Sequence, residues 1–93
     1  MPEAEDYKKF LTDFIQKQMV VLGPNIALDK AKKVPGLTID SSGQVKDLAG
    51  DPQLVIKAAA KEYLALSEAV TKMVLSGLLE KYPAVKALKL IEK

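Results

Sequence analysis

The stretch "VPGLTIDSSGQVKDLAGDP" (residues 34–52) is the one part of the chain that lacks a helical pattern, and it decides the fold class. Leu37 and Ile39 alternate with polar residues, which is typical of a half-buried strand. The run "DSSGQ" (residues 40–44) predicts a three-residue hairpin loop whose glycine adopts the left-handed conformation. We therefore expect a small β-hairpin over residues 37–48.

The predicted register of this hairpin pairs Ile39 with Val45 and Thr38 with Lys46. The two apolar side chains then share one face, as a two-stranded ribbon packed on helices requires. Leu48 falls out of the alternation, so we expect the second strand to be short or bulged.

Amphipathic and capping patterns predict helices on both sides of the hairpin. Apolar residues at i, i+3, i+4 and i+7 predict a first helix over residues 5–22, and a proline suits the first turn of a second helix over residues 24–33. After the hairpin, "GDP" is a strong start for a long helix over residues 52–81, and a short helix is expected over residues 84–91. The expected fold is α+β and mostly helical, with two N-terminal helices, a small β-hairpin, a long third helix and a short C-terminal helix.

The long predicted helix changes its pattern after residue 74. Up to that point its apolar stripe suits packing against the first helix. The side chains expected at this contact are Phe10, Phe14, Tyr63, Leu66 and Val70. Beyond it, Leu75 and Leu79 fall on the angular sector that Lys57 and Lys61 occupy earlier in the helix. A helix that is apolar all round needs cover on all sides, which the C-terminal segment or a second copy of the chain would supply. The predicted interaction residues are Leu64, Leu75, Leu78, Leu79, Leu88 and Ile91.

The composition excludes several classes of site. The 93 residues make one small domain, residues 1–93, without Cys, His or Arg, and all fourteen basic residues are Lys. Thiolate sites are therefore excluded, and the commonest general base and the commonest transition-metal ligand are missing. The glycine patterns of phosphate-binding loops do not occur, and the spacing of the residues after Asp40 fails the calcium-loop pattern. We expect no catalytic residue, no metal and no cofactor, and hence no enzyme.

Charge and hydropathy bear on where the protein is found. The net charge is only +2, and no apolar run approaches the roughly 18 residues that a membrane span needs. The acidic N-terminal stretch is unlike a secretory leader. We therefore expect a cytoplasmic protein without a transmembrane segment.

The first functional hypothesis is a small non-catalytic interaction or regulatory module that self-associates through its long helix. The motive is the excess apolar surface expected around residues 75–79, together with the alanine run at residues 58–60, which lets helices approach closely. We expect a homodimer, with room for a further protein partner that the sequence does not name.

Two alternatives stay open. A winged-helix-like DNA-binding protein would use the helix at residues 24–33 and the hairpin at residues 37–48. Its contact residues would be Asn25, Lys30, Lys32, Lys33 and Lys46. The absence of Arg counts against this alternative, and so does Asp29 in the middle of that helix. The sequence therefore favours a protein partner over nucleic acid. The second alternative is a helical domain that binds a small apolar ligand, lined by Met19 and Met73.

Overall fold

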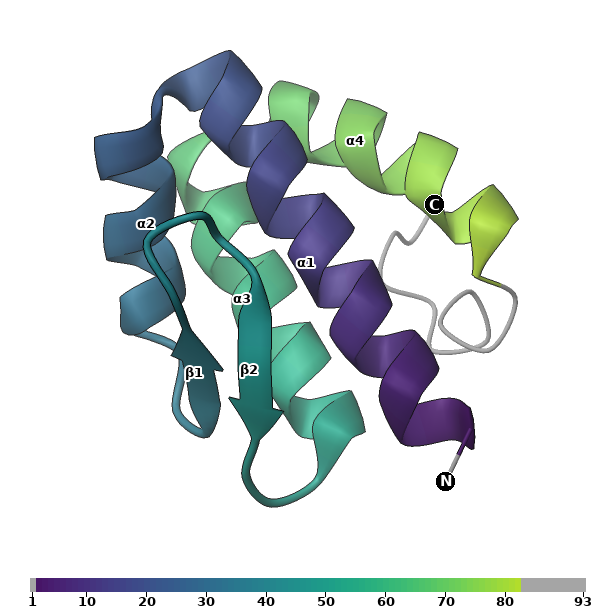
Figure 1. Ribbon diagram of the computed structural model, residues 1–93. Helices are drawn as coiled ribbons and strands as arrows, with labels where there is room; N and C mark the ends of the chain where they lie inside the picture. Colours follow the sequence, from purple (N-terminus) through teal and green to yellow (C-terminus); the bar gives the residue numbers. More distant parts are fainter. Residues whose placement is uncertain (1, 83–93) are drawn as a thin grey trace.

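The computed structural model describes residues 2–82, which form four helices and one two-stranded hairpin (Figure 1). In chain order the elements are α1 (Pro2–Leu22), α2 (Pro24–Lys32), β1 (Leu37–Ile39), β2 (Val45–Leu48), α3 (Pro52–Leu66) and α4 (Glu68–Lys81). The α+β, mostly helical fold expected from the sequence is confirmed, and the helix predicted at residues 84–91 lies outside the described residues. No helix in the described part of the chain combines the length and apolar character needed to cross a membrane.

α1 is the central element, because it contacts the other three helices and β2 (Figure 1). Its apolar stripe is completely buried at Phe10, Leu11, Phe14 and Ile15. Phe14 meets Tyr63 of α3 edge to face, with the ring centroids 5.2 Å apart. The predicted packing of the first helix against the helix after the hairpin is confirmed at these aromatic residues.

α2 packs beside α1 and is joined to α3 by a buried hydrogen bond. Gly23 takes a positive φ of 94° between α1 and α2, and Pro24 follows at the first helical position, where its missing N–H is not needed. Ala27 and Ala31 are buried, since small side chains let the helix lie close to its neighbours. The Tyr63 hydroxyl donates to the carbonyl oxygen of Ala27 at 2.5 Å, which ties α3 to α2.

The hairpin follows the predicted pairing near its loop and departs from it further along. Ile39 pairs with Val45, as expected, whereas Thr38 pairs with Asp47. The predicted pair of Thr38 with Lys46 is therefore wrong, because the register shifts and Lys46 becomes the extra residue of a β-bulge. The broken alternation near the end of the second strand is the sequence signal for this bulge.

The hairpin loop is closed by its own side chains and lies against α1. The Asp40 carboxylate accepts a hydrogen bond from the backbone N–H of Ser42 at 2.9 Å and another from the Ser42 hydroxyl at 2.6 Å. The bond from the hydroxyl is the main cause that lowers the pKa of Asp40 below its usual value. Gly43 has a φ of 86°, and a Cβ at this position would come within 2.7 Å of the Met19 sulfur on α1. Both the backbone angle and the close approach therefore favour glycine here.

The helix predicted over residues 52–81 is two helices, which corrects the expectation of one long third helix. Ser67 has an extended backbone (φ −156°, ψ 106°) and ends α3. Its hydroxyl oxygen accepts a hydrogen bond from the N–H of Val70 at 3.3 Å, so Ser67 is the N-cap of α4. Glu68 in the first turn favours the same start, because its carboxylate lies at the positive end of the helix dipole.

This break turns α4 so that one stripe of the helix faces the core. The buried residues of α4 recur at i, i+3, i+4, i+7 and i+8, and they are Thr71, Val74, Leu75, Leu78 and Leu79. The pattern change after residue 74 therefore reflects a new helix axis rather than a helix that is apolar all round. Leu66, expected at the contact with the first helix, lies at the end of α3 and is 40% exposed, so that part of the predicted contact is wrong. Val70 is half-buried and packs against the core from α4.

α4 packs back across α1 (Figure 1) and is held near both of its ends. Near its start, Gln18 and Thr71 are completely buried, and the Gln18 amide nitrogen donates to the Thr71 hydroxyl oxygen at 3.4 Å. The amide oxygen of Gln18 has no hydrogen-bond partner within residues 2–82. Just past the other end, the Tyr82 hydroxyl donates to the Asp13 carboxylate at 2.7 Å, and its ring meets Phe10 edge to face. α1 and α4 are consequently antiparallel.

Candidate functional site

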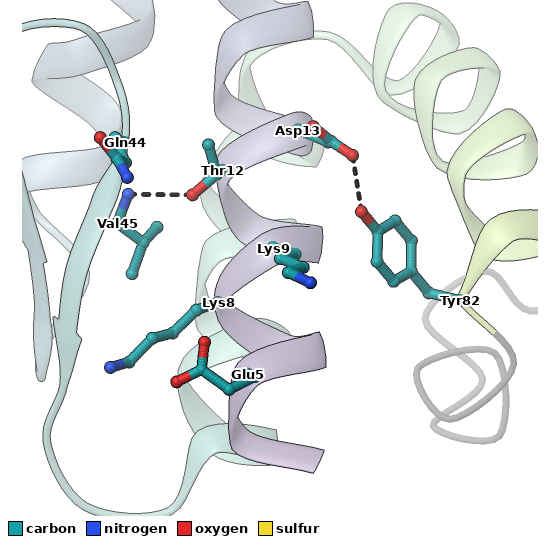
Figure 2. Close-up of a pocket in the computed structure, with 8 residues that line it drawn as sticks. All are labelled: Glu5, Lys8, Lys9, Thr12, Asp13, Gln44, Val45 and Tyr82. Atoms are coloured by element: carbon teal, nitrogen blue, oxygen red, sulfur yellow. Dashed lines mark hydrogen bonds between the residues drawn. The ribbon is translucent and has the colours of Figure 1, made fainter. Parts of the chain in front are cut away.

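A polar pocket of about 380 Å³ opens beside the N-terminal half of α1, the start of β2 and Tyr82 (Figure 2). Its lining residues are Glu5, Lys8, Lys9, Thr12, Asp13, Gln44, Val45 and Tyr82. Two of the polar contacts in this pocket serve the fold. The Val45 N–H donates to the Thr12 hydroxyl oxygen at 3.0 Å, and the Tyr82 hydroxyl donates to Asp13 (Figure 2). These groups attach the hairpin and the end of α4 to α1.

The electrostatic surroundings in this pocket do not activate any of its lining residues for catalysis. Burial, followed by the hydrogen bond to Asp13, raises the pKa of Tyr82 to about 12, so the hydroxyl stays protonated at neutral pH. The same carboxylate also lies 3.9 Å from the Lys81 ammonium group. The lining holds two lysines and two carboxylates, so their charges balance. We find among these lining residues no nucleophile or general base activated by its surroundings.

An apolar groove of about 390 Å³ lies between the C-terminal part of α1 and α4. Its lining residues are Lys17, Val20, Val21, Met73, Val74, Gly77, Leu78 and Lys81. Val74 and Leu78 are buried and belong to the core, whereas Val20 is 86% exposed and Met73 is 63% exposed. Neighbouring apolar side chains at a concave surface are typical of interaction sites, whereas single exposed ones are common on any protein.

Gly77 leaves the groove open along α4. It lies inside the helix, and a Cβ at this position would meet no atom of the described residues within 4 Å. A glycine inside a helix costs about 1 kcal/mol relative to alanine. No contact within the described residues requires this glycine, and its bare backbone forms part of the groove.

Two lysines make one end of the groove positive. Lys17 makes no ion pair within residues 2–82, and Lys81 makes only a long one to Asp13, with 66% of its own side chain exposed. Both lie towards the Tyr82 end of α4, because Lys17 is one helical turn from Asp13, which Lys81 approaches. The lining residues include no acid. The groove therefore has an apolar end near Val20 and a positive end.

The structure places three of the six predicted interaction residues inside the core of the same chain. Leu75, Leu78 and Leu79 are buried, and Leu64 is half-buried. Leu88 and Ile91 lie outside the described residues. The three leucines of α4 are therefore covered almost completely within the chain, so they do not supply the excess apolar surface expected for self-association through the long helix.

The residues of the DNA-binding alternative lie on or next to α2 and on β2. Asn25, Lys30 and Lys32 lie on α2 and Lys33 follows its last residue, and all of them but Lys30 are exposed. Lys33 lies 3.9 Å from Asp29, and Lys46 lies 3.6 Å from Asp40, so an acid accompanies both of these lysines. The hairpin loop is bound to α1, where the Gln16 amide donates to a loop carbonyl oxygen at 3.1 Å. This docking does not favour the projecting wing that the alternative needs.

The sequence pattern does not predict the groove, although two signals for it exist. Val20 falls three residues after Lys17 and seven after Asp13, which places an apolar residue on the polar face of α1. Gly77 is a helix-disfavouring residue within a helical pattern. Of the two methionines proposed to line an apolar pocket, Met73 lines the groove and Met19 packs against the core.

Metal-binding geometry and comparisons with known proteins give no further assignment for the polar pocket or the groove. Within residues 2–82, no three acidic side chains come together as a metal site would require. No protein-family model, curated protein sequence or solved structure matches the chain.

Proposed function

We propose that the protein is a small non-catalytic interaction or regulatory module that binds a protein partner in the groove between α1 and α4. The observation that carries this proposal is the exposed apolar rim, formed by Val20 and Met73 beside the bare backbone of Gly77. Covering apolar surface that faces water is favourable, so a partner that fits this rim gains binding free energy.

The polar pocket supports this role less well than the groove. Its main hydrogen bonds are already made between elements of the fold, and its lysines and carboxylates balance one another. A homodimer, as expected from the sequence, would have to use the groove or another surface, because Leu75, Leu78 and Leu79 are buried.

Peptide display on the 93-residue chain tests the proposal. We expect selection from random peptides of about 16 residues to yield clones whose binding weakens about tenfold or more in Val20→Gln. Leu54→Gln is the matched control, because Leu54 is 64% exposed on α3 and does not line the groove. This control should bind the same clones as the unsubstituted chain.

Both substitutions change exposed positions, so circular dichroism should show an unchanged fold. Clones that bind Val20→Gln as tightly as the unsubstituted chain would place the binding surface elsewhere and contradict the proposal. A selection that yields no clone would contradict it as well.

A further inference from the structure

We infer that the occupant of the groove is an amphipathic helix of a partner protein, with acidic residues flanking its apolar face. This inference rests on the proposed function and names the class of partner. It follows from the shape of the groove, from Gly77 and from the two lysines.

The groove is a trough between two rows of helical side chains. On α1 the lining residues recur at i, i+3 and i+4, starting from Lys17, and on α4 they recur at i, i+1, i+4, i+5 and i+8, starting from Met73. The ridge of a third helix fits such a trough. An extended peptide would need a free sheet edge, whereas backbone groups inside helices are already paired. From Met73 to Lys81 the α4 wall is about 12 Å long, which matches about two turns of a partner helix.

Gly77 is the point of closest approach for this helix. Small residues at a crossing let two helix backbones come near one another, and a Cβ at Gly77 points into open space. The glycine has no packing role within the described chain, and an external helix gives it one.

The charges favour an acidic helix. Lys17 and Lys81 lie at one end of the groove, and no lining residue is acidic. Asp13 lies next to this end, and its carboxylate is already shared by Lys81 and the Tyr82 hydroxyl. Carboxylates on the partner helix would pair with Lys17, which makes no ion pair within residues 2–82.

A second copy of the chain fits the groove less well. The lining comprises eight residues, whereas a stable dimer uses about 20–30 residues on each side. A two-fold axis would also bring both lysine pairs to one interface. The chain's own residues 83–93 carry three lysines and one glutamate, so their charge does not suit this end either.

Two synthetic helical peptides test the inference. Both would have about 14 residues and the same apolar positions at i, i+3, i+4 and i+7, with three flanking glutamates in one and three flanking lysines in the other. By fluorescence anisotropy at low salt, we expect the 93-residue chain to bind the glutamate peptide about tenfold or more tightly than the lysine peptide. This preference should shrink in about 0.5 M salt, which screens exposed charges. Lys17→Glu should reduce it, and Leu54→Gln should leave it unchanged.

Gly77→Ala separates a docking role from a purely structural one. The added methyl group meets no atom of residues 2–82, so we expect a higher melting temperature together with several-fold weaker binding of the glutamate peptide. Unchanged binding in Gly77→Ala would overturn the inference, as would equal or tighter binding of the lysine peptide. A dimer in light scattering that Val20→Gln dissociates would identify a second copy as the occupant and overturn it too.

The outcome of the peptide display separates this inference from the proposed function. Displayed clones that need Val20 but lack acidic residues would support a protein-binding groove and overturn only the acidic helix. If neither the clones nor the synthetic peptides bind, both conclusions fall.

Discussion

Among single residues, Tyr63 joins α3 to both α1 and α2. Its ring packs edge to face against Phe14, and its hydroxyl donates to the Ala27 carbonyl oxygen. Tyr63→Phe keeps the ring and removes the hydrogen bond, so we expect the free energy of unfolding to fall by about 1 kcal/mol in urea titrations. Tyr7→Phe is the control, because within residues 2–82 the Tyr7 hydroxyl only accepts a long hydrogen bond of 3.5 Å from Gln53. Equal losses in the two variants would contradict this prediction.

A second prediction at the residue scale concerns the buried pair Gln18 and Thr71. The Gln18 amide oxygen is unpartnered within residues 2–82, and its nitrogen donates only to Thr71. Thr71→Val removes the acceptor and leaves the buried amide unpaired, so we expect a loss of about 1–3 kcal/mol. Adding Gln18→Met replaces both polar partners and should recover most of that loss. A double-mutant cycle in urea measures the coupling, and strictly additive effects would show that the hydrogen bond is not formed.

At the scale of elements, Ser67 separates α3 from α4. Ser67→Ala removes the hydroxyl oxygen that accepts the Val70 N–H, and we expect a cost of about 1 kcal/mol. Hydrogen exchange should be faster at the first amides of α4, because they lose their cap. Ser76→Ala changes an exposed serine inside α4 and should be neutral or slightly stabilising, since alanine is the better helix former. Matching losses in both variants would argue against the cap.

The element boundaries show which parts of the fold the sequence predicts. Proline and glycine mark the start of α2, the start of β1 and the start of α3, and the expected boundaries at these places agree with the structure. Ser67 and Glu68 carry no proline or glycine mark, and serine, although a good N-cap, also occurs inside helices at little cost. The phase change after residue 74 reveals the break, but the same pattern also suits one helix covered by a partner. The extended backbone at Ser67, which the composition does not reveal, decides between these two interpretations.

The groove was harder to predict than the elements for a related reason. Its walls come from α1 and α4, whose lining residues are more than 50 positions apart in the chain. Which side of α4 remains exposed depends on its rotation, which the break at Ser67 sets. Without that rotation, the sequence pattern predicts that Leu75 and Leu79 need cover and that Met73 belongs to the core, whereas in the structure the two leucines are buried and Met73 is exposed.

At the scale of the whole molecule, α4 is the element that closes the fold over α1. Beyond its C-terminal end, Tyr82 makes this closure with an edge-to-face contact to Phe10 and a hydrogen bond to Asp13. The end of α4 and the residue after it also contribute to both concave sites, because Tyr82 lines the polar pocket and Lys81 lines the groove. Ionisation of Tyr82 should therefore be linked to the stability of the entire chain.

This linkage predicts a loss of stability at high pH. The pKa of Tyr82 is about 12 in the folded chain, against an ordinary value of 10.0. Between these two values the unfolded chain releases the phenolic proton while the folded chain keeps it, so ionisation favours unfolding. The stabilisation is complete below about pH 10 and is lost as the pH rises through about 12. We expect the urea midpoint of Tyr82→Phe to fall less steeply than that of the unsubstituted chain from about pH 9 upwards. Every other ionisable side chain is common to both proteins, so the difference reports Tyr82, and parallel curves would contradict the linkage.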